Sequence, residues 1–212
     1  MLEAQDFKAD MRKIMQAYNN TENFVGDINV QLYTDESQTP IRTIKANQKK
    51  SGKDYLCKVD DITYLLNKKY AIIIDSRNRV ISYTIRSAKS ATDPFKMSGM
   101  PADSLFKTYD KVEYKGEESG LLHYVIICKK YVISKAEIYI DKKTNFFAKT
   151  IYYYNTKAFN NKERSVITFN NVSVLPISKE TFSESQFIIE KDGKLMPSEK
   201  YKNYELVRND LN

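Results

Sequence analysis

Two alternating runs of residues, joined by a short polar connection, constrain the fold of this chain more than any other feature. They lie between Lys135 and Asn155. In the first run Ile138 and Ile140 fall on one side and Tyr139 on the other, the period of two that marks a strand with one dry and one wet face. The second run keeps this period with β-branched and aromatic residues. The connection from Asp141 to Asn145 therefore predicts a meander of antiparallel strands.

Further strands are expected at short spacing on both sides of this pair, separated by turn-forming residues such as Ser51-Gly52 and Gly116 to Gly120. The predicted strands are residues 24–33, 41–48, 54–59, 63–67, 70–75, 79–86, 111–115, 121–129, 132–140, 147–155, 164–174 and 186–190. The run from Ala71 to Ile74 is apolar without alternation, which predicts a strand covered on both faces. The fold class is therefore mainly β, with α+β character from the segments below.

A helix is predicted at the start of the chain. Phe7, Met11, Ile14, Met15 and Tyr18 recur at the helical period of 3.6 residues. Acidic residues gather toward its beginning, where the helix dipole favours them.

The strand rhythm stops between Ser87 and Tyr109. This segment predicts a loop that leads into a short helix from Ala102 to Thr108. Its large apolar residues argue against disorder and predict a lid that borders a cavity; they are Phe95, Met97, Met100, Leu105 and Phe106. Gly99 is the expected flexible point. The alternative is that Met97 and Met100 are ordinary core residues.

The length of 212 residues and the even composition favour one domain, residues 1–190, followed by a polar and loosely attached tail, residues 191–212. No stretch reaches the roughly 18 apolar residues of a membrane span. The residues from Met1 to Lys13 are too polar for a signal peptide, so an export leader is absent from the printed chain.

The charge pattern argues against a nucleic-acid partner. The formal charge is +7, from 34 Lys and Arg against 27 Asp and Glu, and the basic residues are scattered singly along the strands. Lys45, Lys58, Lys130 and Lys149 are examples. A phosphate backbone needs a dense basic stripe, whereas scattered lysines are typical of a solvated strand face.

The sequence contains no recognisable catalytic or metal motif. One histidine, His123, and two cysteines, Cys57 and Cys128, are too few and too widely spaced for a metal site, so no cofactor is expected. The cysteines are either two buried small hydrophobes or a disulfide formed in an oxidising compartment. A nucleophilic Cys and His pair would need an orienting group that the sequence does not reveal. The chain is therefore predicted not to be an enzyme.

The order of these elements resembles the periplasmic outer-membrane lipoprotein carriers of the LolA and LolB type. Four passages carry the resemblance: the opening helix with its lead-in from Tyr18 to Phe24, the run from Asp60 to Asp75, the paired strands described first, and the run from Arg164 to Phe182. The family's early Arg-Pro and Arg-Trp motif is missing, since the chain has no tryptophan. No residue role is transferred from that motif, and Arg42 is given none.

The resemblance implies an incomplete antiparallel β-barrel of about ten to eleven strands, with the N-terminal helix and the inserted helix over its concave face. It implies a periplasmic carrier in a Gram-negative cell, acting as a monomer, that shelters lipid or lipoprotein acyl chains; the alternative is a structural or interaction protein that binds envelope proteins without lipid. The residues expected to line the cavity and its lid are Ile28, Val30, Leu32, Leu66, Ile72, Ile74, Phe95, Met97, Met100, Leu105 and Phe106.

Overall fold

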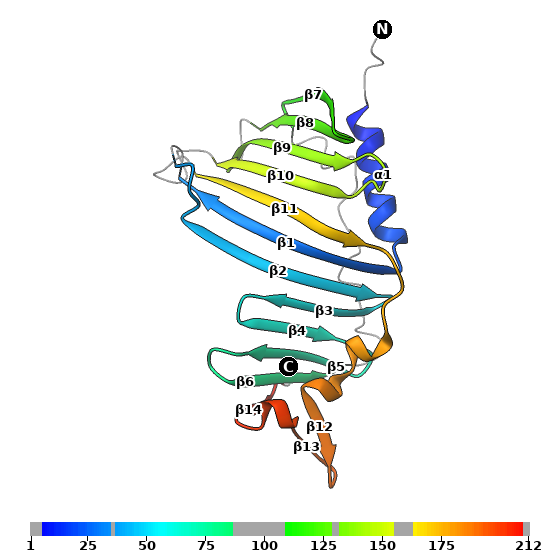
Figure 1. Cartoon of the computed structure of the whole chain (residues 1–212), viewed down its shortest axis with the longest axis vertical. Coiled ribbons are helices and arrows are strands. Elements are labelled where there is room, and N and C mark those ends of the chain that lie inside the picture. Colours follow the sequence, from blue (N-terminus) through cyan, green and yellow to red (C-terminus); the bar gives the residue numbers. More distant parts are fainter. Residues whose placement is uncertain (1–5, 35–36, 87–108, 129–131, 155–162, 210–212) are drawn as a thin grey trace. The chain divides into compact units, whose positions relative to one another are not determined.

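The computed structural model describes residues 6–34, 37–86, 109–128, 132–154 and 163–209. One α-helix precedes the strands, and three short 3-10 helices lie near the C-terminus (Figure 1). The elements are α1 (Phe7–Asn20), β1 (Asn23–Tyr33), β2 (Arg42–Ser51), β3 (Asp54–Val59), β4 (Ile62–Leu66), β5 (Tyr70–Asp75), β6 (Val80–Ile85), β7 (Lys111–Glu118), β8 (Leu121–Ile127), β9 (Ile133–Asp141), β10 (Phe147–Tyr154), β11 (Arg164–Ser173), η2 (Lys179–Phe182), η3 (Glu184–Gln186), β12 (Ile188–Lys191), β13 (Lys194–Pro197), η4 (Glu199–Tyr201) and β14 (Glu205–Arg208).

The strand order confirms the predicted fold class. A 12-stranded sheet has the order β14-β6-β5-β4-β3-β2-β1-β11-β10-β9-β8-β7, and β12 and β13 form a separate pair. Strands β1 to β6 are neighbours in sequence order, as are β7 to β11, so two meanders meet where β1 lies beside β11. The order has two ends, β14 and β7, as an incomplete barrel requires. In the described residues the main sheet has twelve strands, whereas the resemblance implied a barrel of about ten to eleven.

The hairpin predicted on either side of the connection from Asp141 to Asn145 forms in the structure. The ladder of β9 and β10 pairs Thr150 with Ile138 and Tyr152 with Ala136. In the turn, one carboxylate oxygen of Asp141 accepts hydrogen bonds from the backbone N–H groups of Lys143 at 2.9 Å and Thr144 at 2.8 Å. Such local bonds are the reason that Asp favours turns over strands.

The expectation of a loosely attached tail is corrected for residues 191–208. Strand β14 pairs in parallel with β6, and Leu206 lies opposite Ile81. Leu195, Tyr201 and Tyr204 pack against a buried cluster. The sequence did not reveal these few apolar contacts, because the segment is rich in lysine and glutamate. The predicted helix from Ala102 to Thr108 lies outside the described residues.

The chain groups into two compact units. The first unit contains α1, β7 to β10 and the larger parts of β1 and β11. The second unit contains β3 to β6, the larger part of β2 and the segment from η2 to β14. The prediction that residues 1–190 form one domain stays a prediction.

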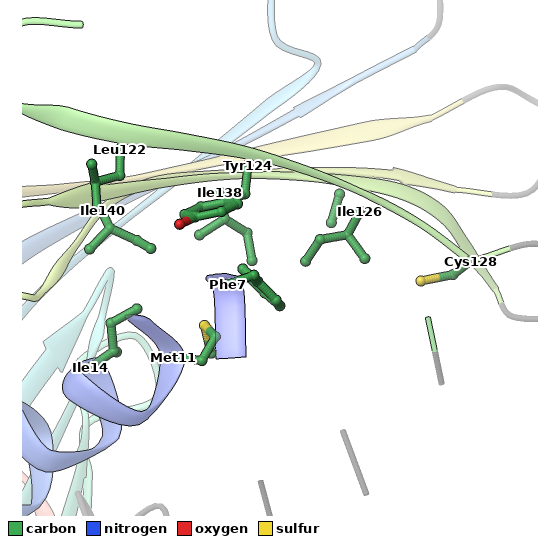
Figure 2. Close-up of a cluster of buried hydrophobic side chains, with 10 residues drawn as sticks. Phe7, Met11, Ile14, Leu122, Tyr124, Ile126, Cys128, Ile138 and Ile140 are labelled. Carbon is green, nitrogen blue, oxygen red and sulfur yellow. The ribbon is translucent and has the colours of Figure 1, made fainter. Parts of the chain in front are cut away.

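Helix α1 covers one face of the first unit's strands (Figure 2). Its N-cap Asp6 accepts a hydrogen bond from the backbone N–H of Lys8 at 2.9 Å, which satisfies one of the free donors of the first turn. Figure 2 shows Phe7 and Met11 pointing from the helix toward Tyr124 and neighbouring isoleucines. The rings of Phe7 and Tyr124 are 5.0 Å apart. The helical face predicted from sequence is therefore the buried one.

Candidate functional site

The predicted cavity residues fall into three groups in the structure. Phe95, Met97, Met100, Leu105 and Phe106 lie outside the described residues, so the lid stays a prediction. Ile28, Val30 and Leu32 are half-buried on β1 in the first unit. Leu66, Ile72 and Ile74 belong to the second unit, where the ladder places them on two different faces.

The β1 residues lie on the side of the sheet that α1 covers. Tyr33, which alternates with them, has its ring 4.4 Å from the guanidinium of Arg164. The neighbour of Arg164 along β11 is Ser165, which pairs with Tyr152, a residue packed against the α1 cluster. Because successive residues of a strand point to opposite faces, Val30 and Leu32 point to the α1 side.

In the second unit, one face of β3 to β6 is filled by the chain's own C-terminal segment. This face, which we term the Ile72 face, carries Leu56, Leu65, Ile72, Ile74, Ile81 and Tyr83. Phe182, Phe187 and Ile188 are buried against it. Ile72 and Ile74 are 1% and 0% exposed, so they are core residues of the second unit. The apolar run from Ala71 to Ile74 predicted a strand covered on both faces. This prediction is wrong, because the C-terminal segment covers the side of Ile72 and Ile74, whereas Ile73 on the other side is exposed.

The opposite face, which we term the Tyr64 face, consists of three rows of side chains. Residues that pair directly across antiparallel strands share a face, and the ladders from β2 to β6 define each row. The first row is Lys50, Tyr55, Leu66, Ala71 and Thr84; the second is Gln48, Cys57, Tyr64, Ile73 and Ser82; the third is Ala46, Val59, Ile62, Asp75 and Val80. Leu66 is thus the one predicted cavity residue on this face.

The Tyr64 face is apolar and partly exposed. Along its second row the exposed fraction is 9% at Gln48 and 8% at Cys57, but 39% at Tyr64 and 41% at Ile73. Tyr64 and Ile73 pair directly across β4 and β5, so their exposed parts form one contiguous apolar surface. The sequence did not single out Tyr64 and Ile73. Their alternation with Leu65 and Ile72 shows that the two pairs lie on opposite faces, but it does not show which face the C-terminal segment covers.

Few polar groups accompany these apolar residues. The Tyr55 hydroxyl donates to Oε1 of Gln48 at 3.4 Å, and burial raises the pKa of Tyr55, so the phenol stays neutral. Lys50 is 2% exposed, although it carries an ammonium group. The carboxylate of Asp75 accepts hydrogen bonds from Arg77 and Asn78 in the adjoining turn. The face thus offers apolar contact and a few fixed polar groups, the composition of a site for an apolar ligand.

A polar cluster on the first unit was also missed by sequence reasoning. Glu137 accepts hydrogen bonds from Lys135 at 3.0 Å, Tyr139 at 3.2 Å and Tyr153 at 2.9 Å, and its Oε2 lies 3.2 Å from Nε2 of His123. Burial opposes the charge, but the hydrogen bonds from Lys135 and Tyr153 outweigh it and lower the pKa of Glu137. A carboxylate with four such neighbours is satisfied by the protein itself, so we assign the cluster a structural role.

In the first unit, the thiol of Cys128 does not form a reactive pair with His123. Cys128 continues the side of β8 that carries Tyr124 and Ile126, whereas His123 points to the other side and stacks on Tyr139 at 4.2 Å. Both cysteines are buried free thiols. Burial also raises the pKa of Cys128, which disfavours the nucleophilic thiolate.

Within the described ranges, no group of three His, Cys, Asp or Glu side chains is placed to hold a metal ion. No helix of this part of the chain has the length and hydropathy to cross a membrane.

Comparison with known proteins gives similarity at the level of structure. No family model matches the chain, and no curated protein matches it. Among solved structures, an uncharacterized conserved protein from Thermus thermophilus has 9% identity and a TM-score of 0.49, with 94% of this chain and 99% of that chain covered. Lipoprotein LppX from Mycobacterium tuberculosis has 10% identity and a TM-score of 0.42, with coverages of 81% and 96%.

A third solved structure is a LolA superfamily protein from Nitrosomonas europaea, with 6% identity and a TM-score of 0.32 over 82% of this chain and 97% of that one. At these identities and TM-scores the likenesses say nothing about cargo or partners. The LolA superfamily protein bears the name of the family that the order of elements resembles, and the likeness concerns the fold alone.

Proposed function

We propose that this chain is a non-enzymatic binding protein that shelters an acyl chain on the Tyr64 face. The observation that supports the proposal is the contrast between the two faces of the same strands. The Ile72 face is closed by Phe182, Phe187 and Ile188, whereas Tyr64 and Ile73 remain 39% and 41% exposed. An apolar chain laid across the second row would remove both side chains from water.

The energy of such contact suffices for reversible binding. Burial yields about 0.8 kcal/mol per methylene, so a dozen methylenes yield on the order of 10 kcal/mol at most. Association costs at least about 4 kcal/mol of translational and rotational freedom. The remaining energy, about 6 kcal/mol, corresponds to a dissociation constant no tighter than roughly tens of micromolar, which suits a carrier that must release its cargo.

The test is titration of the purified protein with a fluorescent acyl probe, combined with native mass spectrometry and lipid extraction. We expect saturable binding, and we expect Ile73→Asn to weaken it about tenfold because a polar amide replaces a contacting apolar group. The matched control is Ile189→Asn, since Ile189 has a similar exposure of 38% but lies on β12.

Two outcomes would count against the proposal. Absence of saturable probe binding together with absence of extracted lipid would remove the acyl-binding role and favour the rival function, an interaction protein of the cell envelope. Equal weakening by Ile73→Asn and Ile189→Asn would place the binding elsewhere. The periplasmic location is proposed from the sequence resemblance, and fractionation of the native host would test it.

A further inference from the structure

The hairpin of β12 and β13 is a two-stranded sheet within the second unit, and its two faces have different surroundings (Figure 1). On the inner face, Ile188 and Leu195 contact the buried cluster that covers the Ile72 face. Ile189 pairs with Met196 on the other face, which we term the outer hairpin face. These two side chains are 38% and 40% exposed. The fold of the second unit therefore uses only one face of the hairpin.

Two lysines continue the outer hairpin face toward the turn. Lys191 pairs directly with Lys194, and both are exposed. The turn between them consists of Asp192 and Gly193, whose φ angles of 53° and 71° are both positive, as a tight two-residue hairpin turn requires. Like charges directly opposite each other destabilise a strand pair. A negatively charged partner would relieve this repulsion.

The protein does not compensate the two lysines by itself. Among the described residues, the ammonium groups of Lys191 and Lys194 take part in no hydrogen bond or ion pair. Glu190 pairs with Leu195 and therefore belongs to the inner face, where its charge acts on Lys69. The outer hairpin face thus combines two exposed apolar side chains with two exposed cations that are available to a partner.

The small size of this face argues for a lipid surface over a protein. A stable protein interface buries roughly 800 Å² on each partner, from about 20–30 residues, whereas four side chains make up the outer hairpin face. A bilayer needs no matching shape, because apolar side chains enter the boundary of headgroups and acyl chains while lysine stems extend toward the phosphates. Self-association through this face would bring two such lysine pairs together.

We propose that the outer hairpin face attaches the protein reversibly to membranes that contain anionic lipid. Ile189 and Met196 enter the headgroup boundary, and Lys191 and Lys194 bind lipid phosphates. Each lysine near an anionic surface strengthens binding about fivefold, so four side chains give weak and reversible attachment. The inference is independent of the acyl-binding function proposed above, because that function uses the Tyr64 face of β3 to β6.

The first experiment is co-sedimentation of the full chain with vesicles of phosphatidylcholine, with or without about one third phosphatidylglycerol. We expect binding to be at least about tenfold stronger with the anionic lipid. Lys191→Gln combined with Lys194→Gln should weaken it by about tenfold or more. About 0.5 M salt should have a similar effect, because exposed charges are screened.

The matched control is Lys53→Gln combined with Lys58→Gln. Both lysines are exposed in the second unit, and the pair of substitutions removes the same charge. Because these residues lie outside the hairpin, vesicle binding should change by less than about threefold. The control separates a contribution of the hairpin from that of the chain's net charge of +7.

A second experiment tests the apolar part of the face. Ile189→Asn should weaken vesicle binding about fivefold and leave acyl-probe binding unchanged, whereas Ile73→Asn should do the reverse. The chain has no tryptophan, so Met196→Trp introduces a single reporter. Its fluorescence should shift to shorter wavelength with anionic vesicles, because the ring enters the membrane interface, and should stay unchanged with phosphatidylcholine alone.

The results that overturn the inference are distinct. Equal binding to both vesicle types removes the preference for anionic lipid. Vesicle binding that survives loss of Lys191 and Lys194, or that falls equally in the Lys53 and Lys58 control, removes the role of the hairpin. Equal weakening by Ile73→Asn assigns vesicle binding to the Tyr64 face.

Binding to polyglutamate without binding to vesicles indicates an acidic protein partner and also overturns the inference. None of these results bears on acyl-probe binding, which is measured separately. If circular dichroism shows that Ile189→Asn does not fold, the lysine variants and Met196→Trp still decide.

Discussion

At the scale of single residues, the most informative contact is one that sequence patterns do not reveal. The hydroxyl of Tyr124, which is 0% exposed, donates to Oδ2 of Asp10 on α1 at 2.6 Å. Asp10 is itself 3% exposed and lies 2.9 Å from Nζ of Lys13. Asp10 is one of the acidic residues that the sequence places near the start of the helix. The structure shows that it also attaches the helix to β8 within an otherwise apolar cluster.

We expect Tyr124→Phe to lower the free energy of unfolding by about 1.5 to 3 kcal/mol, because it removes a hydrogen bond to a buried charged group. Chemical denaturation measures this change. The control is Tyr152→Phe in the same cluster, because Tyr152 packs there through its ring. Its effect should stay below about 1 kcal/mol. Equal losses in the two variants would show that removal of a hydroxyl from this cluster, and not loss of the specific bond to Asp10, accounts for the effect.

At the scale of elements, the C-terminal segment is part of the second unit's core. Asn67 anchors it, since its side-chain amide donates to the carbonyl of Phe182 at 3.0 Å and to Glu184 at 2.8 Å. Ser198 donates to the carbonyl of Gln186 at 2.9 Å. These contacts hold η2 and β12 against the Ile72 face, which is why that face is filled by the chain itself.

Two adjacent isoleucines of β12 test this role. Ile188 is 1% exposed in the cluster, whereas Ile189 is 38% exposed. We expect Ile188→Ala to lower the free energy of unfolding by about 2 to 5 kcal/mol, as deletion of a buried side chain leaves a cavity. Ile189→Ala should cost less than about 1 kcal/mol. Comparable costs at the two positions would mean that the segment is not fixed on the sheet in solution.

At the scale of the whole molecule, both units contain carboxylates whose pKa is held below its ordinary value. Hydrogen bonds from Asn171 and Asn47 lower the pKa of Asp27 in the second unit. Burial would raise the pKa of Glu137, but hydrogen bonds from its neighbours lower it overall. The hydrogen bonds of Lys111 and Lys115 lower the pKa of Glu113 to about 2. Each such group stabilises the fold only in its ionised form.

We therefore expect these carboxylates to contribute fully to the free energy of unfolding above about pH 4.5, and we expect the free energy of unfolding to fall progressively toward pH 2. A carboxylate with a lowered folded-state pKa binds its proton more readily after unfolding, so acid favours the unfolded chain. Melting temperatures recorded between pH 7 and pH 2 measure this loss of stability. Glu137→Gln should make this pH dependence less steep, whereas Glu190→Gln at an exposed position of β12 should not. A pH profile unchanged by Glu137→Gln would contradict this assignment.

Much of the fold followed from the sequence because its causes are local. The period of two fixed the strands, the 3.6-residue period fixed α1 and its buried face, and Asp141 fixed a turn through its own hydrogen bonds. Neighbouring strands joined by short turns then had to pair, which gave the two meanders. The junction of β1 with β11 and the parallel pairing of β14 with β6 could not be predicted, because they join segments that lie far apart in the chain.

The candidate site depended on tertiary structure for the same reason. Alternation separates Ile72 from Ile73 but treats the two faces of a strand alike, and only the packing of Phe182 and Phe187 makes one face core and leaves the other partly exposed. The sequence therefore determined which residues share a face. The C-terminal segment decided which face is available to a ligand, because burial depends on what a distant part of the chain places against it.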